Sequence, residues 1–263
     1  MINFFRKIRQ HLLTENKFSK YLLYAFGEIA LVMTGILLAL QVNNWNEERI
    51  LRMQIKTNLL NLSSAISQDL ELLNQIEESN EFRSISILQT LKWANISLEE
   101  IDSFPLTLSG TTIWRKPIPE TFNQDFFGET FVWITRPRRM IIQSYAMEEL
   151  KSLGLYSRIT NQKLKDSLNE YYTDLSWYFG GDNISDFKFL DELQDYLRNN
   201  HNLRFIDIPR MENPLEFIKN DPGIIVRLRD VSNYAEWRMI GAKTSKMRAV
   251  ELLKEIQTEI TKQ

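Results

Sequence analysis

The stretch that decides the fold lies near the N-terminus, where residues 21–42 read YLLYAFGEIALVMTGILLALQV. Glu28 is the only charged residue among these 22. At about 1.5 Å of rise per residue, a helix of this length covers the roughly 30 Å hydrocarbon core of a bilayer. The sequence therefore predicts a single transmembrane helix over residues 21–42, with the lipid bilayer as its surroundings.

The residues on either side of this stretch predict how it is anchored. Tyr21 and Tyr24 at one end and Trp45 at the other stand where aromatic side chains meet the membrane interface. A cleaved signal peptide needs a short apolar core followed by small residues, but this core is long and ends in the bulky polar sequence QVNNWN. The pattern therefore favours a permanent anchor over a cleaved signal, and its flanks argue against a buried helix of a soluble protein.

The distribution of basic residues predicts the orientation. Residues 1–20 carry five Lys or Arg residues and one acidic residue, whereas the whole chain has a formal charge of −2. Basic residues favour the cytoplasmic side, so we expect residues 1–20 to form a basic amphipathic segment there. The remaining residues, 43–263, then form a domain on the opposite side. This domain is acidic overall, which argues against a nucleic-acid partner.

Glu28 is the one residue within the apolar stretch that suggests a functional role. It shares a helix face with Gly35 and Ala39, which form a small-xxx-small pattern that lets membrane helices approach closely. One hypothesis is helix packing or partner recognition through this face, and another is proton coupling through Glu28. The simpler alternative is a tolerated carboxyl group, because Glu28 lies only about 10 Å along the helix from Tyr21.

The rest of the chain reads as an elongated antiparallel helical bundle. No Gly or Pro occurs from residue 36 to 104, so the membrane helix can continue outward without a break. Apolar residues recur every three or four positions over 55–76. We expect a turn at residues 77–80, and a second helix from Phe82. Asp221-Pro222 is a helix start signal, and it predicts a helix of about forty residues to Ile260.

Residues 102–140 interrupt this helical pattern. They contain Pro and Gly residues and β-favouring runs at 111–114 and 130–135. We expect an irregular excursion or a small β-hairpin here. Its aromatic and basic residues form a possible partner-binding loop, although solvated surface charges are the simpler interpretation. The residues of this candidate loop are Trp114, Arg115, Arg136 and Arg138.

No pattern for catalysis or for a cofactor is found. The chain has no cysteine and only two histidines, His11 and His201, which argues against a zinc site. Phosphate-binding loops of the Walker A or GxGxxG type and a GxSxG nucleophile motif are absent. We therefore expect no cofactor, no metal and no enzymatic activity.

Several segments of the sequence resemble a known family. MINFFRKIRQ (1–10), ENKFSKY (15–21), GEI (27–29) and GILLALQVNNWN (35–46) are similar to a large Bacteroidota family of single-pass inner-membrane proteins with a domain of unknown function. Residues 145–154 and 164–172 resemble a second segment of that family. The resemblance implies a bacterial inner-membrane protein with a periplasmic C-terminal domain, and it implies no activity.

Three hypotheses of function follow from the sequence. The leading one is a non-enzymatic, membrane-anchored periplasmic scaffold, accessory or sensor-like subunit that binds a protein partner or associates with copies of itself. The alternative is a transport or energy-coupling subunit in which Glu28 works inside a membrane assembly. A periplasmic enzyme ranks third.

Overall fold

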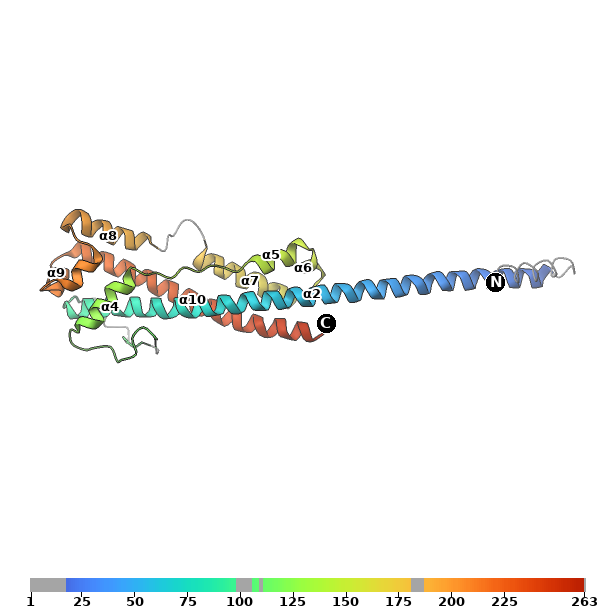
Figure 1. Cartoon of the computed structure of the whole chain (residues 1–263), viewed down its shortest axis with the longest axis horizontal. Coiled ribbons are helices and arrows are strands. Elements are labelled where there is room, and N and C mark those ends of the chain that lie inside the picture. The colour runs from blue at the N-terminus through green and yellow to red at the C-terminus, as the bar shows by residue number, and fades with distance from the viewer. Residues whose placement is uncertain (1–17, 98–105, 109–110, 181–186, 263) are drawn as a thin grey trace. The chain divides into compact units, whose positions relative to one another are not determined.

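The computed structural model describes residues 18–97, 106–108, 111–180 and 187–262, and every regular element in them is a helix. The predicted all-α fold class is confirmed. The chain divides into two compact units, Met1–Lys56 and Thr57–Gln263. The first helix, α2, spans Phe18–Trp93 and contributes to both units (Figure 1).

The first unit is helical throughout its described part. The predicted basic segment 1–20 lies outside the described residues as far as residue 17. From Leu22 to Val42 nearly all side chains are exposed, including Leu23 and Leu31, which are 78% and 72% accessible. The predicted boundary at residue 43 lies inside α2, so the apolar stretch and the residues after it belong to one continuous helix.

The turn predicted at residues 77–80 is wrong, because α2 continues through these residues to Trp93. Polar side chains at this point bond to their own helix instead of ending it. The Ser79 hydroxyl and the Asn80 amide donate to the Ile76 carbonyl at 3.2 and 2.8 Å. Both residues are buried, so this polar stretch lies inside the second unit.

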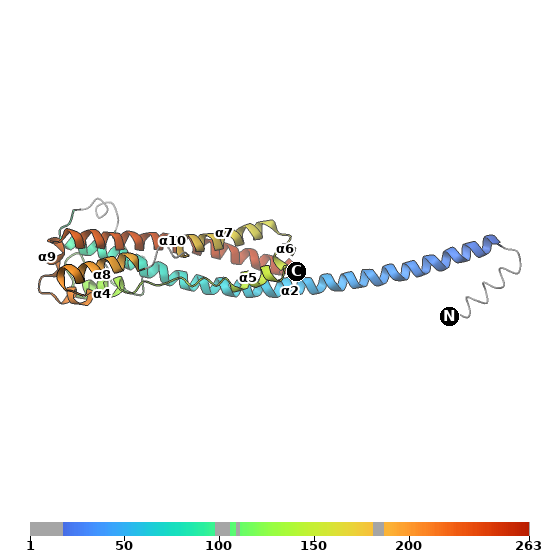
Figure 2. The same cartoon turned by 90° about the horizontal axis from the view of Figure 1, so that it is seen from above.

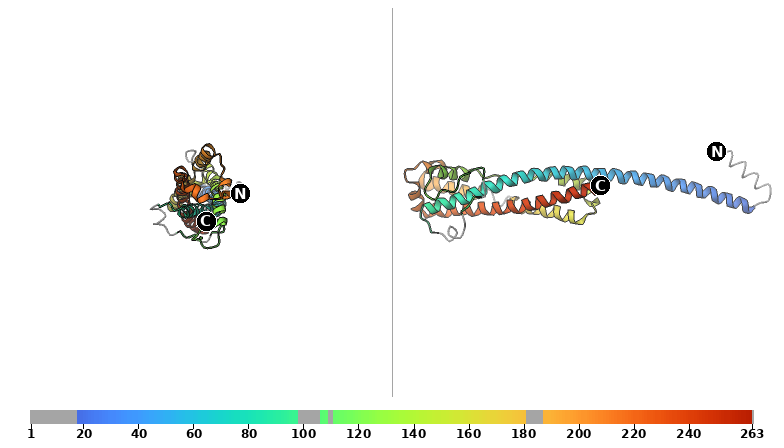
Figure 3. Two further views of the ribbon diagram at one scale, coloured as in Figure 1. Left: turned by 90° about the vertical axis from the view of Figure 1, so that its left-hand side faces the viewer. Right: turned by 90° about the horizontal axis from the view of Figure 1, so that it is seen from below.

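The long helix α10, Pro222–Lys262, confirms the forty-residue helix predicted after Asp221. Within the second unit it runs antiparallel to the later part of α2, as Figure 3 shows in the right-hand view. Lys246 pairs with Glu77, whereas Ser232 lies 3.1 Å from the Ser84 hydroxyl, so residue numbers fall on one helix as they rise on the other. Together with α7, the two helices bury an apolar core; its members include Leu59, Leu62, Ile66, Leu73, Ile76, Leu168, Leu175, Ala242, Ala249 and Ile256.

The next three helices along the chain after α4 are α5 (Tyr145–Ser152), α6 (Leu155–Arg158) and α7 (Gln162–Phe179) (Figure 2). Gly154 separates the first two at φ 69°, a left-handed conformation that glycine adopts without steric cost. The Asn161 side chain accepts a hydrogen bond from the Leu164 amide, and so caps α7. Helix α7 then packs along α10.

The β-hairpin expected in residues 102–140 is wrong for the described part of that range. Residues 111–123 are irregular, as the alternative to a hairpin predicts, and α4 (Gln124–Ile134) contains residues 130–134 of the β-favouring run 130–135. The Asn123 side chain accepts from the Phe126 amide at 2.9 Å and starts the helix. Phe126, Phe127 and Phe131 are buried, so burial of an aromatic face favours the helix over the residues' own β preference.

The remaining elements cluster around α4 and the start of α10. They are α8 (Lys188–His201), the 3-10 helix η1 (Phe205–Arg210) and α9 (Pro214–Lys219). They share a second apolar core with α4 and the end of α2, built from residues such as Leu91, Phe127, Leu197, Ile208 and Ile218. This cluster positions the pocket described next.

Candidate functional site

The first unit presents a long apolar surface. Helix α2 is long and apolar enough to cross a membrane, and none of its most apolar window is buried inside the protein. A core helix of a soluble protein would cover most of such a surface, and exposed apolar patches of this extent mark an interaction with lipid or protein.

The predicted packing residues lie on this exposed surface. Glu28, Gly35 and Ala39 are all exposed on α2. A Cβ atom added to Gly35 meets nothing within 4 Å, so the face is open to an approaching helix. Of the predicted interfacial anchors, Trp45 is exposed and Tyr24 is half-buried, whereas the side chain of Tyr21 lies outside the described residues.

The four residues of the predicted partner loop have different surroundings. The Trp114 ring packs edge-on against Phe126 of α4, with centroids 5.0 Å apart, and its indole nitrogen donates to the Pro117 carbonyl. Arg115 is exposed. Arg138 donates to the Gln75 side chain at 2.9 Å, while Arg136 lines a pocket. Trp114 therefore has a packing role that its sequence context did not reveal.

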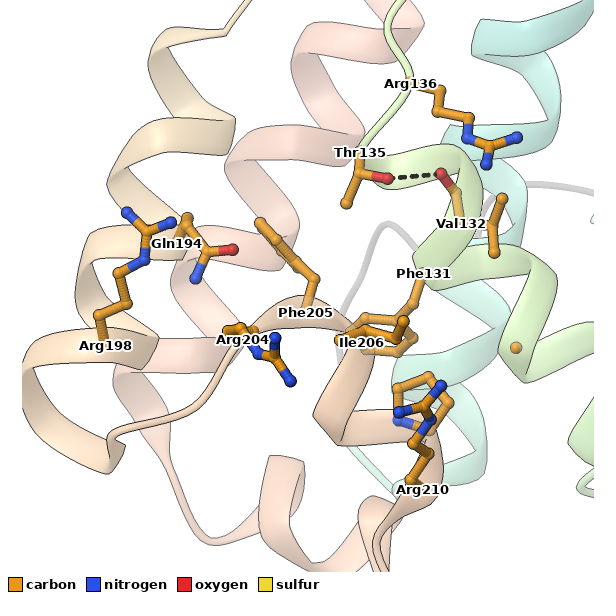
Figure 4. A pocket seen from close by; sticks show the side chains of 12 residues that line it. Phe131, Val132, Thr135, Arg136, Gln194, Arg198, Arg204, Phe205, Ile206 and Arg210 are labelled. Atoms are coloured by element: carbon orange, nitrogen blue, oxygen red, sulfur yellow. Dashed lines mark hydrogen bonds between the residues drawn. The ribbon is translucent and has the colours of Figure 1, made fainter.

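This pocket lies between α4, α8 and η1 and has a volume of about 510 Å³ (Figure 4). Its apolar part is formed by side chains of α4 and η1, and its rim carries arginines from three segments. Gln124 of α4 donates to the Pro209 carbonyl of η1 at 2.6 Å and holds the two walls together. The lining residues are Gly128, Phe131, Val132, Thr135, Arg136, Gln194, Arg198, Arg204, Phe205, Ile206, Pro209 and Arg210.

The lining carries four arginines and no carboxylate. One of them is already paired, because Arg204 donates to Asp207 at 3.1 Å through its guanidinium and at 2.8 Å through its backbone amide. The side-chain and backbone bonds from Arg204 lower the pKa of the Asp207 carboxyl. Arg198 has only a loose partner, Asp195 at 3.9 Å, and both of these side chains are exposed. The pocket therefore has an excess of positive charge beside an apolar surface.

A buried carboxyl group lies elsewhere in the second unit, at the contact between α2 and α7. Asp69 is fully buried and accepts hydrogen bonds from the Gln143 amide and the Tyr171 hydroxyl, both at 3.1 Å. Burial raises its pKa from 3.8 to about 6, although the two hydrogen bonds act in the opposite direction. Burial and the nearby Asp69 also raise the pKa of Tyr171. Asp69 is enclosed and has no access to a substrate, so we interpret this group as structural.

A second polar group lies at the start of α10. The Asp221 carboxylate lies 2.6 Å from His201 Nε2 and accepts from the Tyr196 hydroxyl at 2.9 Å and the Gly223 amide at 2.8 Å. Burial raises the pKa of Asp221, but the hydrogen bond from Tyr196 and those from the helix amides outweigh burial and lower it. The carboxylate caps the helix and ties α8 to it.

Sequence reasoning found Arg136 but missed the pocket, because its other arginines lie more than fifty positions further along the chain. Among the described residues, no group of three potential ligands is arranged to hold a metal ion. Compared with known proteins, the chain matches no family model, no curated protein and no solved structure.

Proposed function

We propose that this protein is a single-pass, membrane-anchored helical protein whose second unit binds a protein partner or a second copy, as a scaffold, accessory or sensor-like subunit. Its location would be a bacterial inner membrane, with residues 1–20 cytoplasmic and residues 43–263 periplasmic. The observation that carries the proposal is the exposed apolar surface of residues 22–42. In water this surface is unfavourable, whereas lipid tails solvate it.

The sequence flanks support the orientation. Five basic residues precede the span, and three, Arg49, Arg52 and Lys56, follow it within about fifteen positions, the distance over which such residues influence topology. The excess on the N-terminal side favours a cytoplasmic N-terminus. The resemblance to the Bacteroidota family agrees with this orientation.

The absence of cysteine makes the topology directly testable, because single-cysteine variants need no background substitutions. Gln10→Cys labels the N-terminal side, and Gln257→Cys labels an exposed position of α10. In cells with a permeabilised outer membrane, we expect a membrane-impermeant maleimide to modify Gln257→Cys, and to modify Gln10→Cys only after lysis. The reverse pattern would overturn the orientation. Recovery of the protein in the soluble fraction after carbonate washing would overturn the anchor itself.

An interaction role is supported by two features of the described residues. The face of α2 that carries Gly35 and Ala39 is open, and close helix approach is the use that small-xxx-small faces have in membranes. The polar groups of the second unit that resemble catalytic groups, Asp69 and Asp221, are committed to internal hydrogen bonds. Binding is therefore favoured over catalysis.

Chemical crosslinking of intact membranes followed by purification of the full chain tests this role. We expect a discrete crosslinked product, either a dimer of the chain or a one-to-one complex with another membrane or periplasmic protein. A protein that remains monomeric and alone at native expression levels would contradict the proposal. An activity towards a small substrate retained by the purified monomer would favour an enzyme instead.

A further inference from the structure

We propose that the pocket between α4, α8 and η1 binds a small amphipathic organic acid, with an apolar body against the pocket floor and a carboxylate at the arginines. This inference is independent of the membrane anchor and adds a ligand site to the second unit. It rests on the pocket's apolar lining, on its unbalanced positive charge and on one buried donor without an acceptor.

The floor of the pocket selects an apolar body. Phe131 and Phe205 are buried at its base, and Ile206 of η1 is 51% exposed beside them. Figure 4 labels Phe131 and Val132 on α4 and Ile206 on η1 among the side chains that line the pocket. A volume of about 510 Å³ lies within the range of roughly 300–1,000 Å³ that small-molecule sites occupy. A ligand of that size removes the exposed apolar side chains from water.

The rim of the pocket selects negative charge. Arg136 follows α4, Arg198 lies in the last turn of α8, and Arg210 ends η1, so three separate segments contribute an arginine to the pocket lining. Arg204 pairs with Asp207, which also interacts with Arg210, and Arg198 lies 3.9 Å from Asp195. The four arginines therefore outnumber these two carboxylates, and no carboxylate lines the pocket itself. Guanidinium groups match the planar carboxylate with paired charge-assisted hydrogen bonds.

Gln194 of α8 supplies the third observation. Its side-chain nitrogen is buried in the pocket wall and has no hydrogen-bond partner within the described residues. Buried polar atoms in proteins are nearly always hydrogen-bonded, because an unsatisfied donor costs free energy. A ligand oxygen placed between Gln194 and the arginines accepts this hydrogen bond and completes the site.

The experiment uses the full chain in lipid nanodiscs and three probes, with binding followed by titration calorimetry and by saturation-transfer NMR. 4-Phenylbutyrate has both the apolar body and the carboxylate. 4-Phenylbutanamide keeps the body without the charge, and inorganic phosphate keeps the charge without the body. We expect saturable binding of phenylbutyrate, with the amide and phosphate each weaker by about tenfold or more, as expected for the loss of a charge-assisted contact or of the buried body.

Two kinds of variant test the location. Arg198→Gln or Arg210→Gln should weaken phenylbutyrate binding about tenfold or more each, and the exposed Arg158→Gln, in the four-residue helix α6, is the matched charge control. Gly128 lines the pocket, and a Cβ added there meets nothing within 4 Å. Gly128→Leu should therefore fill the pocket and abolish binding, while Gly128→Ala should retain it.

The outcomes separate clearly. Selective loss in the pocket variants, with Arg158→Gln and Gly128→Ala unaffected, supports the site. Equal binding of phenylbutyrate and its amide would overturn the anionic selectivity. Equal weakening by Arg158→Gln would show diffuse electrostatic attraction and overturn the location. Absence of saturable phenylbutyrate binding to the folded parent protein would overturn the proposal as a whole.

Discussion

Replacing Asp69 by Asn should remove a pH-dependent loss of folding stability from the second unit. The carboxyl group is fully buried between α2 and α7, and burial raises its pKa from 3.8 to about 6. The folded protein therefore binds the proton more tightly than the unfolded chain does. The protonated form is the favoured one inside the fold, so this group contributes stability below its unfolded pKa and loses it as the pH rises through about 6.

The magnitude follows from the two pKa values. Each unit of difference corresponds to about 1.4 kcal/mol, so a shift from 3.8 to about 6 amounts to about 3 kcal/mol in full. Roughly 2 kcal/mol of this is lost between about pH 4.5 and pH 8, because the unfolded carboxyl is already mostly ionised at the lower pH. Asn is neutral at every pH and mimics the protonated acid. Relative to the parent, Asp69→Asn should therefore gain about 2 kcal/mol between these two pH values.

Urea unfolding of the full chain in mild detergent, followed by the helical circular dichroism signal, measures this difference. The parent and Asp69→Asn share all other ionisable groups, so subtracting their free energies of unfolding isolates Asp69. Tyr171→Phe is an informative companion variant, because the Tyr171 hydroxyl bond lowers the Asp69 pKa. Its removal should move the pH-dependent loss to higher pH. A pH-independent difference between the parent and Asp69→Asn, or one that favours the parent at pH 8, would refute the reasoning.

Three further predictions concern helix contacts. Gly241→Ala should destabilise the second unit by about 1–3 kcal/mol, because the new Cβ would lie 2.6–2.8 Å from atoms of Tyr178 on α7; urea unfolding tests this, with Gly128→Ala as the control that meets no neighbour. Gly35→Ile should abolish self-association in membrane crosslinking while insertion persists, whereas Gly35→Ala should retain both. Glu28→Gln should leave insertion and partner association unchanged; retained association with loss of a partner's proton-dependent activity would favour the energy-coupling alternative.

The sequence predicted helix boundaries that are set by interactions between residues close together in the chain. Asp221 and Pro222 start α10 because the carboxylate accepts from the Gly223 and Ile224 amides at 2.8 and 3.2 Å. These features depend on residues within a few positions of one another, and so a single sequence is enough to read them.

The sequence did not predict features that depend on residues far away in the chain. Residues 77–80 look like a turn, but Lys246 of α10 pairs with Glu77 there. Ser79 and Asn80, whose side chains donate to the Ile76 carbonyl of their own helix, are buried in the second unit. Arg83 is buried for the same reason, since it donates to Asn80 at 2.7 Å and to the Trp133 carbonyl of α4 at 3.1 Å. Contacts across fifty or more residues are not visible in local periodicity. The arginine-lined pocket belongs to this class.

Helix α2 contains two stretches with opposite burial patterns, and this contrast supports the membrane proposal. Between residues 22 and 42 it exposes Leu, Ile, Val and Met side chains, whereas between residues 79 and 90 it buries Ser, Asn, Arg, Gln and Thr. If water surrounded the whole helix, it would favour the opposite pattern at both places, with the apolar side chains buried and the polar side chains exposed. The buried polar stretch is balanced by hydrogen bonds within the second unit. The exposed apolar stretch has no such partner among the described residues, so surroundings of low polarity outside the protein are what it requires.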